Sequence, residues 1–498
     1  MLKLKELFKV KPVEPAGHID AGEPFEGSLD GEATLKRTLT ARQLMLLGVG
    51  AMIGAGIFVL SGHAAADHAG PAVVLSYVIA SFACALAGLC YAEFSAMLPV
   101  SGSAYSYSYA TLGEVVAWFI GWNLVLEYLF ASASVAVSWS GYMNSLLDSM
   151  GLSLPAMLAS APFIATGGQI TYVEGAILNL PAVIIIALIS GLCYVGITQS
   201  AFVNAIIVAI KITVIVLFVA FSVRYINLDY MQPFIPERVI DANGHGHYGT
   251  EGIIRAAAVV FYSYIGFDAV STSAGEAKNP QRDMPIGILG SLVICTVIYI
   301  AVSFVLTGLL PYTQLNTPKP VATALEAYPS LGWLKTLVEI GAIAGLSSVI
   351  LVMLMAQPRI FYSMSKDGLM PRIFSAVHRN FHTPYKGTII VGVISAILSG
   401  FMPLSVLGDL VSMGTLLAFA TVCIGVVVLR YTRPDLERPF RVPFAKLVAP
   451  LGAAVCLYLF WQPFKEHWHL MLGWTVCGFI IYSCYGYRHS KLRRASKN

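Results

Sequence analysis

Glu127, Lys211 and Asp268 stand inside apolar stretches long enough to cross a membrane. A charge at membrane depth is costly, so such residues usually face a cavity, pair with one another or carry function. Burial away from water disfavours the charged form of a lysine, which suits Lys211 to gain and lose a proton. The alternatives are a permanent ion pair with a carboxylate for Lys211, and a structural role for Glu127 as a hydrogen-bonded or protonated side chain.

Two apolar stretches contain residues that weaken a helix. The stretch 48–62 contains Gly48, Gly50, Gly54 and Gly56, and each glycine in a helix interior costs about 1 kcal/mol relative to alanine. The second stretch contains Gly266-Phe267-Asp268 among aromatic residues. Irregular backbone at membrane depth is tolerated only where it is buried in protein or lines a cavity. We therefore expect both helices to open, the first at Ile53–Ile57, and to border a buried polar site.

The elements that must hold this site are membrane helices. Of the 498 residues, 57% are hydrophobic and 12% are charged, and the mean hydropathy is +0.73. Soluble domains carry about 25% charged residues. Stretches long enough to span the hydrocarbon layer predict a polytopic protein with about twelve transmembrane helices. These stretches begin near residues 42, 71, 115, 174, 201, 253, 286, 336, 387, 405, 446 and 468.

The distribution of lysine and arginine predicts the orientation. The first 40 residues are polar and lack the apolar core of a cleaved signal peptide, so we expect a tail retained in the cytosol. Most lysines and arginines fall in this tail, in 359–386 and 430–446, or near the C-terminus, as on the inner side of membrane proteins. We expect a multi-pass protein of the cytoplasmic membrane with both termini inside. The net charge of +4 reflects this orientation and does not indicate nucleic acid binding.

The two weakened helices occupy corresponding places in two halves of the chain. Inverted repeats with a broken helix in each half mark a transporter site at the bilayer midplane. The expected division is a cytosolic tail (1–40), a core of helices 1–10 (41–430) with inverted repeats at about 41–224 and 252–430, helices 11–12 (431–487) and a second cytosolic tail (488–498).

Four motifs, in order along the chain, resemble those of the amino acid–polyamine–organocation superfamily. Within it, the sequence is most similar to the cationic amino acid transporter family in its shorter bacterial form, and the resemblance covers roughly residues 36–487. The motifs are Gly50–Phe58, the segment from Ala92-Glu93 to Glu114 with Met97-Leu98-Pro99, Phe267-Asp268 followed by Glu276–Pro280, and Arg359–Leu369.

The resemblance implies an all-α protein with the leucine-transporter fold, a 5+5 inverted repeat and broken helices 1 and 6. In similar transporters, amides of the open first helix hold the substrate carboxylate, and exposed amides at a helix N-terminus suit an anion. Carbonyls of the open sixth helix hold the α-ammonium, and an aromatic ring caps the substrate. For this chain, the resemblance implies a carboxylate site formed by Ile53, Gly54, Ala55 and Gly56. It implies an ammonium site formed by Tyr262, Ser263 and Ile265, with the Tyr262 ring as the cap. Many relatives have a hydroxyl residue at the position of Ala55, so that side-chain contact is expected to be missing.

Lys211 matches a lysine that, in proton-coupled relatives, takes the place of a sodium ion. The resemblance therefore implies proton coupling without sodium, and no metal or other cofactor. A charged ammonium there could bridge helices one and five and release them when neutral.

The substrate's side chain is the least determined feature. A cationic side chain would need an acid near the pocket, and Glu127 and Asp268 are the candidates. The eighth span offers an apolar wall that ends at Met353, which suits neutral amino acids at least as well. We therefore expect an L-amino acid substrate and a broad neutral and cationic specificity.

Functions other than proton-coupled symport are also compatible with these motifs. A sodium-independent exchanger would use the same site, and an amino acid sensor would bind without moving its ligand. The ten histidines are scattered along the chain and form no convergent set with a nucleophile or metal ligands that would indicate an enzyme. A small membrane subunit and a homo-oligomer both remain open as partners besides the lipid bilayer.

Overall fold

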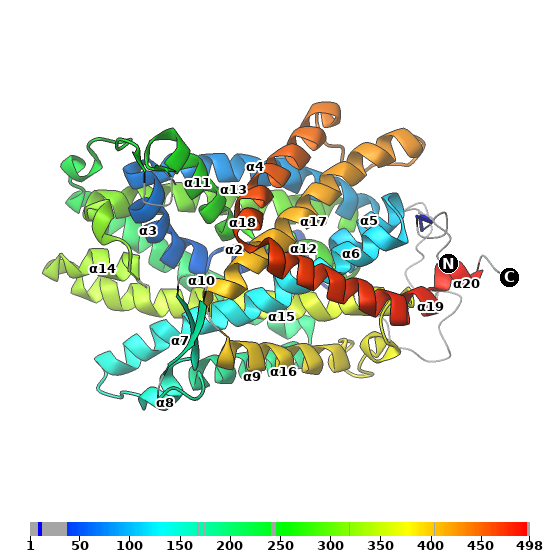
Figure 1. The fold of residues 1–498 in the computed structure, drawn as a ribbon, viewed down its shortest axis with the longest axis horizontal. Coiled ribbons are helices and arrows are strands. Elements are labelled where there is room, and N and C mark those ends of the chain that lie inside the picture. Colours follow the sequence, from blue (N-terminus) through cyan, green and yellow to red (C-terminus); the bar gives the residue numbers. More distant parts are fainter. Residues whose placement is uncertain are drawn as a thin grey trace.

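The computed structural model describes residues 8–11, 37–166, 169–173, 175–240, 246–317, 319–402 and 404–495. Most of the predicted N-terminal tail, and the last three residues, lie outside the described residues. The described part is dominated by helices that run roughly along one common direction (Figure 1).

The longer helices are α2 (Ala41–Met52), α4 (Val73–Met97), α5 (Ser103–Thr111), α6 (Glu114–Val125), α7 (Ala131–Ser149), α9 (Leu180–Val195), α10 (Ile197–Ser222), α11 (Gly249–Phe261), α13 (Pro280–Leu309), α15 (Gly332–Lys366), α16 (Tyr385–Phe401), α17 (Leu404–Thr432) and α18 (Ala445–Ile481). The shorter helices are α3 (Ser61–Ala64), α8 (Ala156–Ala159), α12 (Ala269–Thr272), α14 (Pro320–Glu326), α19 (Tyr487–His489) and α20 (Lys491–Ala495).

Nine stretches of the described chain are long and apolar enough to cross a membrane. One of them, Ala41–Met97, has 57 residues and holds the first and second predicted spans. Two shorter apolar helices, α9 and α16, coincide with the predicted fourth and ninth spans. The prediction of a polytopic helical membrane protein is therefore confirmed, although by length and composition nine stretches qualify and not twelve.

Two short hairpins depart from the prediction of a purely helical chain. Strands β1 (Phe163–Thr166) and β2 (Gln169–Tyr172) pair antiparallel between α8 and α9. Strands β3 (Val239–Ile240) and β4 (Gly246–His247) pair in the same way before α11. Both hairpins lie in connections between apolar helices, where the helical periodicity used for the prediction carries no information.

Local sequence explains several helix ends. Thr40 caps α2 by accepting from the Gln43 amide, while the Gln43 side chain accepts from the Thr40 amide, which forms a capping box. Asn179 caps α9 through its side chain. Gly368 follows the end of α15 at φ +81°, a conformation that favours glycine. These signals fix where the helices that border the site begin and end.

The described parts of both chain ends meet beside the end of α15. The Lys11 ammonium forms an ion pair with Asp367 at 2.6 Å. The Lys491 amide donates to the Asp367 carbonyl at 3.1 Å. We call this end of the molecule, where α19 and α20 lie in Figure 1, the terminal face.

Candidate functional site

The first helix opens within the predicted segment. Helix α2 ends at Met52, and Ile53 is extended, with φ −76° and ψ 97°. A π-helical turn, Gly56–Leu60, then resumes the helix. The amides of Gly54, Ala55 and Gly56 stand where a helical segment starts, and such amides lack partners within the helix. They are available to an anion.

Ile53 differs from its predicted role. Its amide donates to the Val49 carbonyl at 3.1 Å and so completes the last turn of α2. The predicted carboxylate site therefore retains three of its four amides, because the extended backbone begins after the Ile53 nitrogen.

The sixth helix opens at the same level. Helix α11 ends at Phe261, and a single 3-10 turn, Tyr262–Tyr264, follows it. Gly266 then adopts φ +119°, which a residue with a side chain rarely tolerates. The Tyr262 carbonyl accepts from the Ile265 amide at 3.2 Å, and the Ser263 carbonyl accepts from the Tyr299 hydroxyl at 2.7 Å. Each carbonyl retains a second lone pair for an ammonium group.

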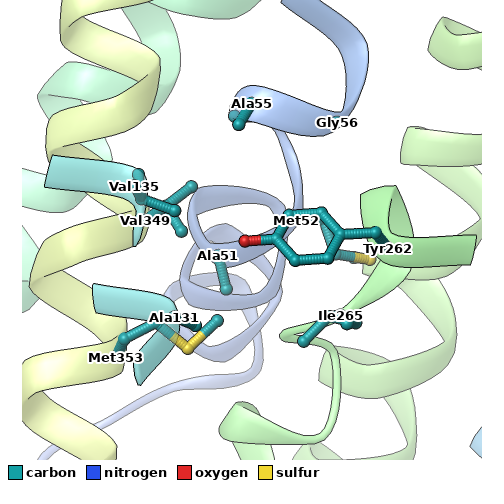
Figure 2. A pocket seen from close by; sticks show the side chains of 11 residues that line it. Ala51, Met52, Ala55, Gly56, Ala131, Val135, Tyr262, Ile265, Val349 and Met353 are labelled. Atoms are coloured by element: carbon teal, nitrogen blue, oxygen red, sulfur yellow. The ribbon is translucent and has the colours of Figure 1, made fainter. Parts of the chain in front are cut away.

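A pocket lies between the two openings (Figure 2). Tyr262 extends its ring across it, and the Tyr262 hydroxyl lies 3.1 Å from Ser134 Oγ. Of the predicted binding residues, Ile53 and Ser263 are absent from the lining. The lining residues are Ala51, Met52, Gly54, Ala55, Gly56, Ala131, Val135, Tyr262, Ile265, Val349 and Met353.

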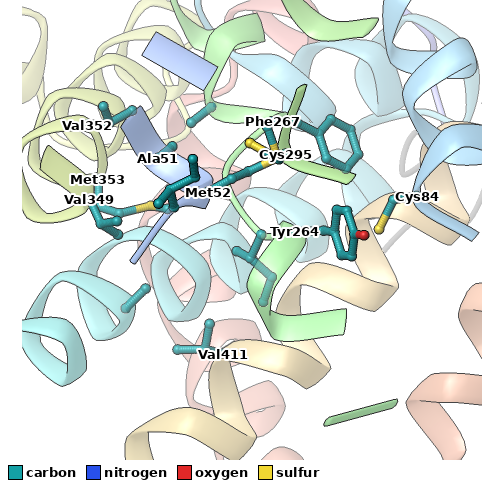
Figure 3. Close-up of a cluster of buried hydrophobic side chains, with 14 of the residues drawn as sticks. Ala51, Met52, Cys84, Tyr264, Phe267, Cys295, Val349, Val352, Met353 and Val411 are labelled. Carbon is teal, nitrogen blue, oxygen red and sulfur yellow. The ribbon is translucent and has the colours of Figure 1, made fainter. Parts of the chain in front are cut away.

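The floor of the pocket is made by close backbone contact. A Cβ added to Gly266 would lie 2.6 Å from the Ala51 Cβ and 3.2 Å from the Met353 Cε. Figure 3 shows Ala51 between Met353 on one side and Phe267 on the other. The glycine thus lets the sixth helix approach the first and the eighth.

The first and sixth helices also pass close to one another at Gly56. A Cβ added there would lie 2.4 Å from the Ser263 Cα, which is a backbone atom and cannot rotate away. We expect Gly56→Ala to separate the two open helices, to weaken substrate binding at least about tenfold and to lower the melting temperature. Gly141→Ala is the control, because a Cβ there meets nothing within 4 Å, and it should leave binding unchanged. Ligand titration and thermal unfolding in detergent measure both effects; equal binding by the two variants would contradict the close crossing.

Lys211 joins three helices beside the opening. Its buried ammonium donates to the carbonyls of Gly50 and Ile53, both at 2.9 Å, and to the Ser348 hydroxyl at 2.7 Å. Ser348 also donates to the Gly50 carbonyl at 2.8 Å. Among the described residues, no carboxylate partners Lys211, so the permanent ion pair considered from the sequence is not seen. The ammonium instead holds the open end of α2 against α10 and α15.

Glu127 and Asp268 lie together, outside the pocket lining. Asp268 accepts a short hydrogen bond from the Tyr128 hydroxyl, and Glu127 lies beside Asp268 and Thr415. Glu127 belongs to a π-helical turn, Leu126–Phe130, a distortion often found at functional sites. Two adjacent buried carboxylates cannot both stay ionised without a compensating cation. The pair is therefore suited to hold a proton and does not border a substrate side chain.

A buried ion pair lies between the pocket and the terminal face. Arg359 of α15 donates to the two carboxylate oxygens of Glu276 at 2.7 and 3.2 Å. The Glu276 carbonyl accepts from the amides of Thr38 and Leu39, just before α2. One ion pair thus ties α15 to the segments that flank both open helices. We call it the Arg359–Glu276 latch.

Sequence reasoning missed several residues of the site. Ala131 and Val135 follow Glu127 at intervals of four residues, so the acid could have indicated them as neighbours on one helix face. Val349 precedes Met353 by the same interval. The Arg359–Glu276 latch joins two motifs that the sequence had singled out separately, and nothing in the chain order indicated their contact.

A family model described as "Amino acid permease" matches residues 39–484. The chain is 42% identical over 491 residues to a methylthioribose transporter of Bacillus subtilis (strain 168), covering 99% of this chain and 100% of that protein. It is 43% identical over 469 residues to the branched-chain amino acid permease BcaP of the same organism, covering 93% and 96%. It is 39% identical over 407 residues to the vacuolar cationic amino acid transporter 2 of Arabidopsis thaliana, covering 81% and 61%.

Proposed function

The chain belongs to the amino acid permease family, and from this premise we propose that it is a proton-coupled secondary transporter of neutral L-amino acids with apolar side chains. It is a multi-pass membrane protein, and the family resemblance inferred from its four sequence motifs is confirmed. Family membership supports transport of an amino acid and argues against an enzyme. Substrate preference and coupling are the parts that we propose here.

The observation that carries the proposal is the pairing of two open helices across one pocket. Gly54, Ala55 and Gly56 line the pocket at the first opening, and Tyr262 and Ile265 line it at the second, after the end of α11. Amides at a helix N-terminus favour an anion, and carbonyls favour an ammonium group. An α-amino acid carries both groups on one carbon, so backbone recognition alone can orient it.

The lining favours a neutral, apolar side chain. Val349 and Met353 lie beside Val135 and Ala131 on one side of the pocket (Figure 2), and no carboxylate is among the lining residues that the structure describes. A desolvated cationic side chain would need such a partner. The pocket therefore supports the neutral part of the specificity expected from the sequence, and the similarity to a branched-chain amino acid permease agrees with it.

The proposed architecture is the 5+5 inverted repeat, with repeats at about 41–224 and 252–430 and helices 11 and 12 outside them. It is supported by the two helix openings at corresponding places in the halves. We further propose that the terminal face is cytosolic, because the lysine and arginine clusters near 359–386 and 488–494 lie at this end of the chain's helices.

Protons are proposed to couple transport through Lys211. A charged Lys211 holds the open end of α2 by two carbonyls, and a neutral amine would hold it less strongly. The runner-up is sodium-independent exchange at the same pocket, in which Lys211 would stay charged throughout. A non-transporting sensor is the third possibility.

The full-length similarity to a methylthioribose transporter supports a second candidate substrate. Methylthioribose is a sugar that carries a methylthio group, without an ammonium or a carboxylate. Its hydroxyls would need several polar side chains, and Tyr262 supplies the hydroxyl in the described lining. The pocket therefore favours the amino acid.

Counterflow in proteoliposomes tests the function. Vesicles loaded with unlabelled leucine should take up labelled leucine, because a transporter exchanges its substrate and a sensor does not. Valine, isoleucine and methionine should compete, whereas arginine, lysine and methylthioribose should require at least about tenfold higher concentrations. Binding of leucine without movement of label would indicate a sensor, and stronger competition by arginine or methylthioribose would replace the proposed substrate.

A further inference from the structure

Gln357 of α15 is a fully buried polar side chain whose amide nitrogen and oxygen both lack a hydrogen-bond partner among the described residues. Leaving a buried polar group unpaired costs roughly 1–3 kcal/mol. The cost disappears only in a conformation in which the amide finds partners. The transport pocket, already described, does not include this residue.

Gln357 lies one helical turn beyond the pocket. Val349 and Met353 line the pocket at an interval of four residues along α15, and Gln357 continues the same series. Helix α15 then ends at Lys366, next to Asp367 on the terminal face. The step from Met353 to Gln357 therefore leads out of the pocket towards that face, on the proposed route to the cytosol.

Gln357 lies beside the segment that carries Asp268. One turn before Gln357, the Met353 Cε lies 3.2 Å from the position of a Cβ added to Gly266. Two residues after Gln357, Arg359 pairs with Glu276. The chain from Gly266 to Glu276 therefore follows α15 past Gln357, and the π-helical turn that carries Tyr128 also packs against α15. The unpaired amide and the Tyr128–Asp268 pair, joined by the Tyr128 hydroxyl, therefore lie at the same level, between the pocket and the Arg359–Glu276 latch.

We propose that Gln357 and the Tyr128–Asp268 pair form a second, lower subsite for the charged groups of the amino acid. This inference rests on the proposed function. The Gln357 amide donates to the substrate carboxylate, and the Asp268 carboxyl, with Glu127 beside it, accepts from the α-ammonium. The substrate occupies this lower subsite after it leaves the pocket and before it enters the cytosol.

Two barriers enclose the lower subsite in this conformation. Gly266, packed against Ala51 and Met353, separates it from the pocket. The Arg359–Glu276 latch, two residues beyond Gln357 on α15, separates it from the terminal face. Opening of the first barrier before the second would let the amino acid pass through the subsite without a continuous channel.

Gln357→Leu tests the lower subsite. Leucine is close in size to glutamine and removes the unpaired amide, so a purely structural role predicts equal or higher thermal stability and unchanged transport. A subsite role predicts that the equilibrium affinity for leucine stays within about twofold, while the maximal counterflow rate falls about tenfold. Ser190→Ala is the matched control: the Ser190 hydroxyl is also buried and unpaired, but it lies on α9 against Gly392. This control should transport at the normal rate.

A second variant keeps the inference falsifiable if leucine disturbs folding. In Gln357→Cys, an impermeant thiol reagent added on the cytosolic side should label residue 357, and saturating leucine should slow labelling at least about threefold. Suppose that the wild type shows counterflow. An unchanged rate in Gln357→Leu, or labelling of Gln357→Cys that leucine does not slow, would then overturn the lower subsite alone. A wild-type protein that moves none of the twenty amino acids would instead overturn the proposed function.

Discussion

Lys211→Ala is expected to abolish accumulation of leucine driven by a pH difference. A difference of one pH unit supplies about 1.36 kcal/mol per proton, which symport of one proton converts into about tenfold accumulation. Without the ammonium, the Gly50 and Ile53 carbonyls lose their common donor, and no group at this point gains or loses a proton. The internal-to-external ratio of labelled leucine in proteoliposomes, acidic outside, should therefore fall from about ten to about one.

Three controls separate proton coupling from general damage. Lys211→Arg keeps a charge that cannot be released, so it should bind leucine yet accumulate none. Lys335→Ala removes a partly exposed lysine that pairs with Glu326 at 2.7 Å, and it should accumulate normally. Replacing sodium with choline should change nothing for the wild type. Normal pH-driven accumulation by Lys211→Ala would remove Lys211 from the coupling mechanism, and a requirement for sodium would refute proton coupling.

The sequence predicted the residues that are energetically costly in a membrane helix, but it did not indicate which ordinary apolar residues line the pocket. Glycine in an apolar stretch, or a charge at membrane depth, carries a local cost, so the opening near Gly54 and the burial of Lys211 could be inferred without coordinates. Ala131 and Val349 are ordinary membrane residues. Their place in the pocket depends on which face of each helix turns inward, and that is decided by packing between distant segments.

The buried acids show the same limit. Glu127 and Asp268 were each recognisable as costly, yet the sequence left open whether they border the substrate side chain. The structure places them beside one another and outside the pocket lining. Pairing between helices far apart in the chain changed their interpretation from contacts of the substrate's side chain to candidate proton carriers.

Arg359→Met is the second substitution with a large expected effect. The side chains of Arg359 and Glu276 are 4% and 1% exposed, so removal of one partner leaves the other charge buried and unpaired. Breaking a buried pair in this way costs about 3–5 kcal/mol. We expect a marked fall in the melting temperature and loss of counterflow, because the segments before α2 and after α12 lose their common attachment to α15.

The double variant Glu276→Leu/Arg359→Met separates charge burial from latch function. Two apolar side chains of similar size should recover most of the lost stability, since no unpaired charge remains. They should not restore a closed cytosolic side, because packing contacts lack the directional hold that the two hydrogen bonds to Glu276 provide. Gln357→Cys combined with this double variant should therefore react with a cytosolic thiol reagent faster than Gln357→Cys in a chain that keeps Arg359 and Glu276. Stability recovered together with parental labelling would show that the ion pair supports folding and does not close the pathway.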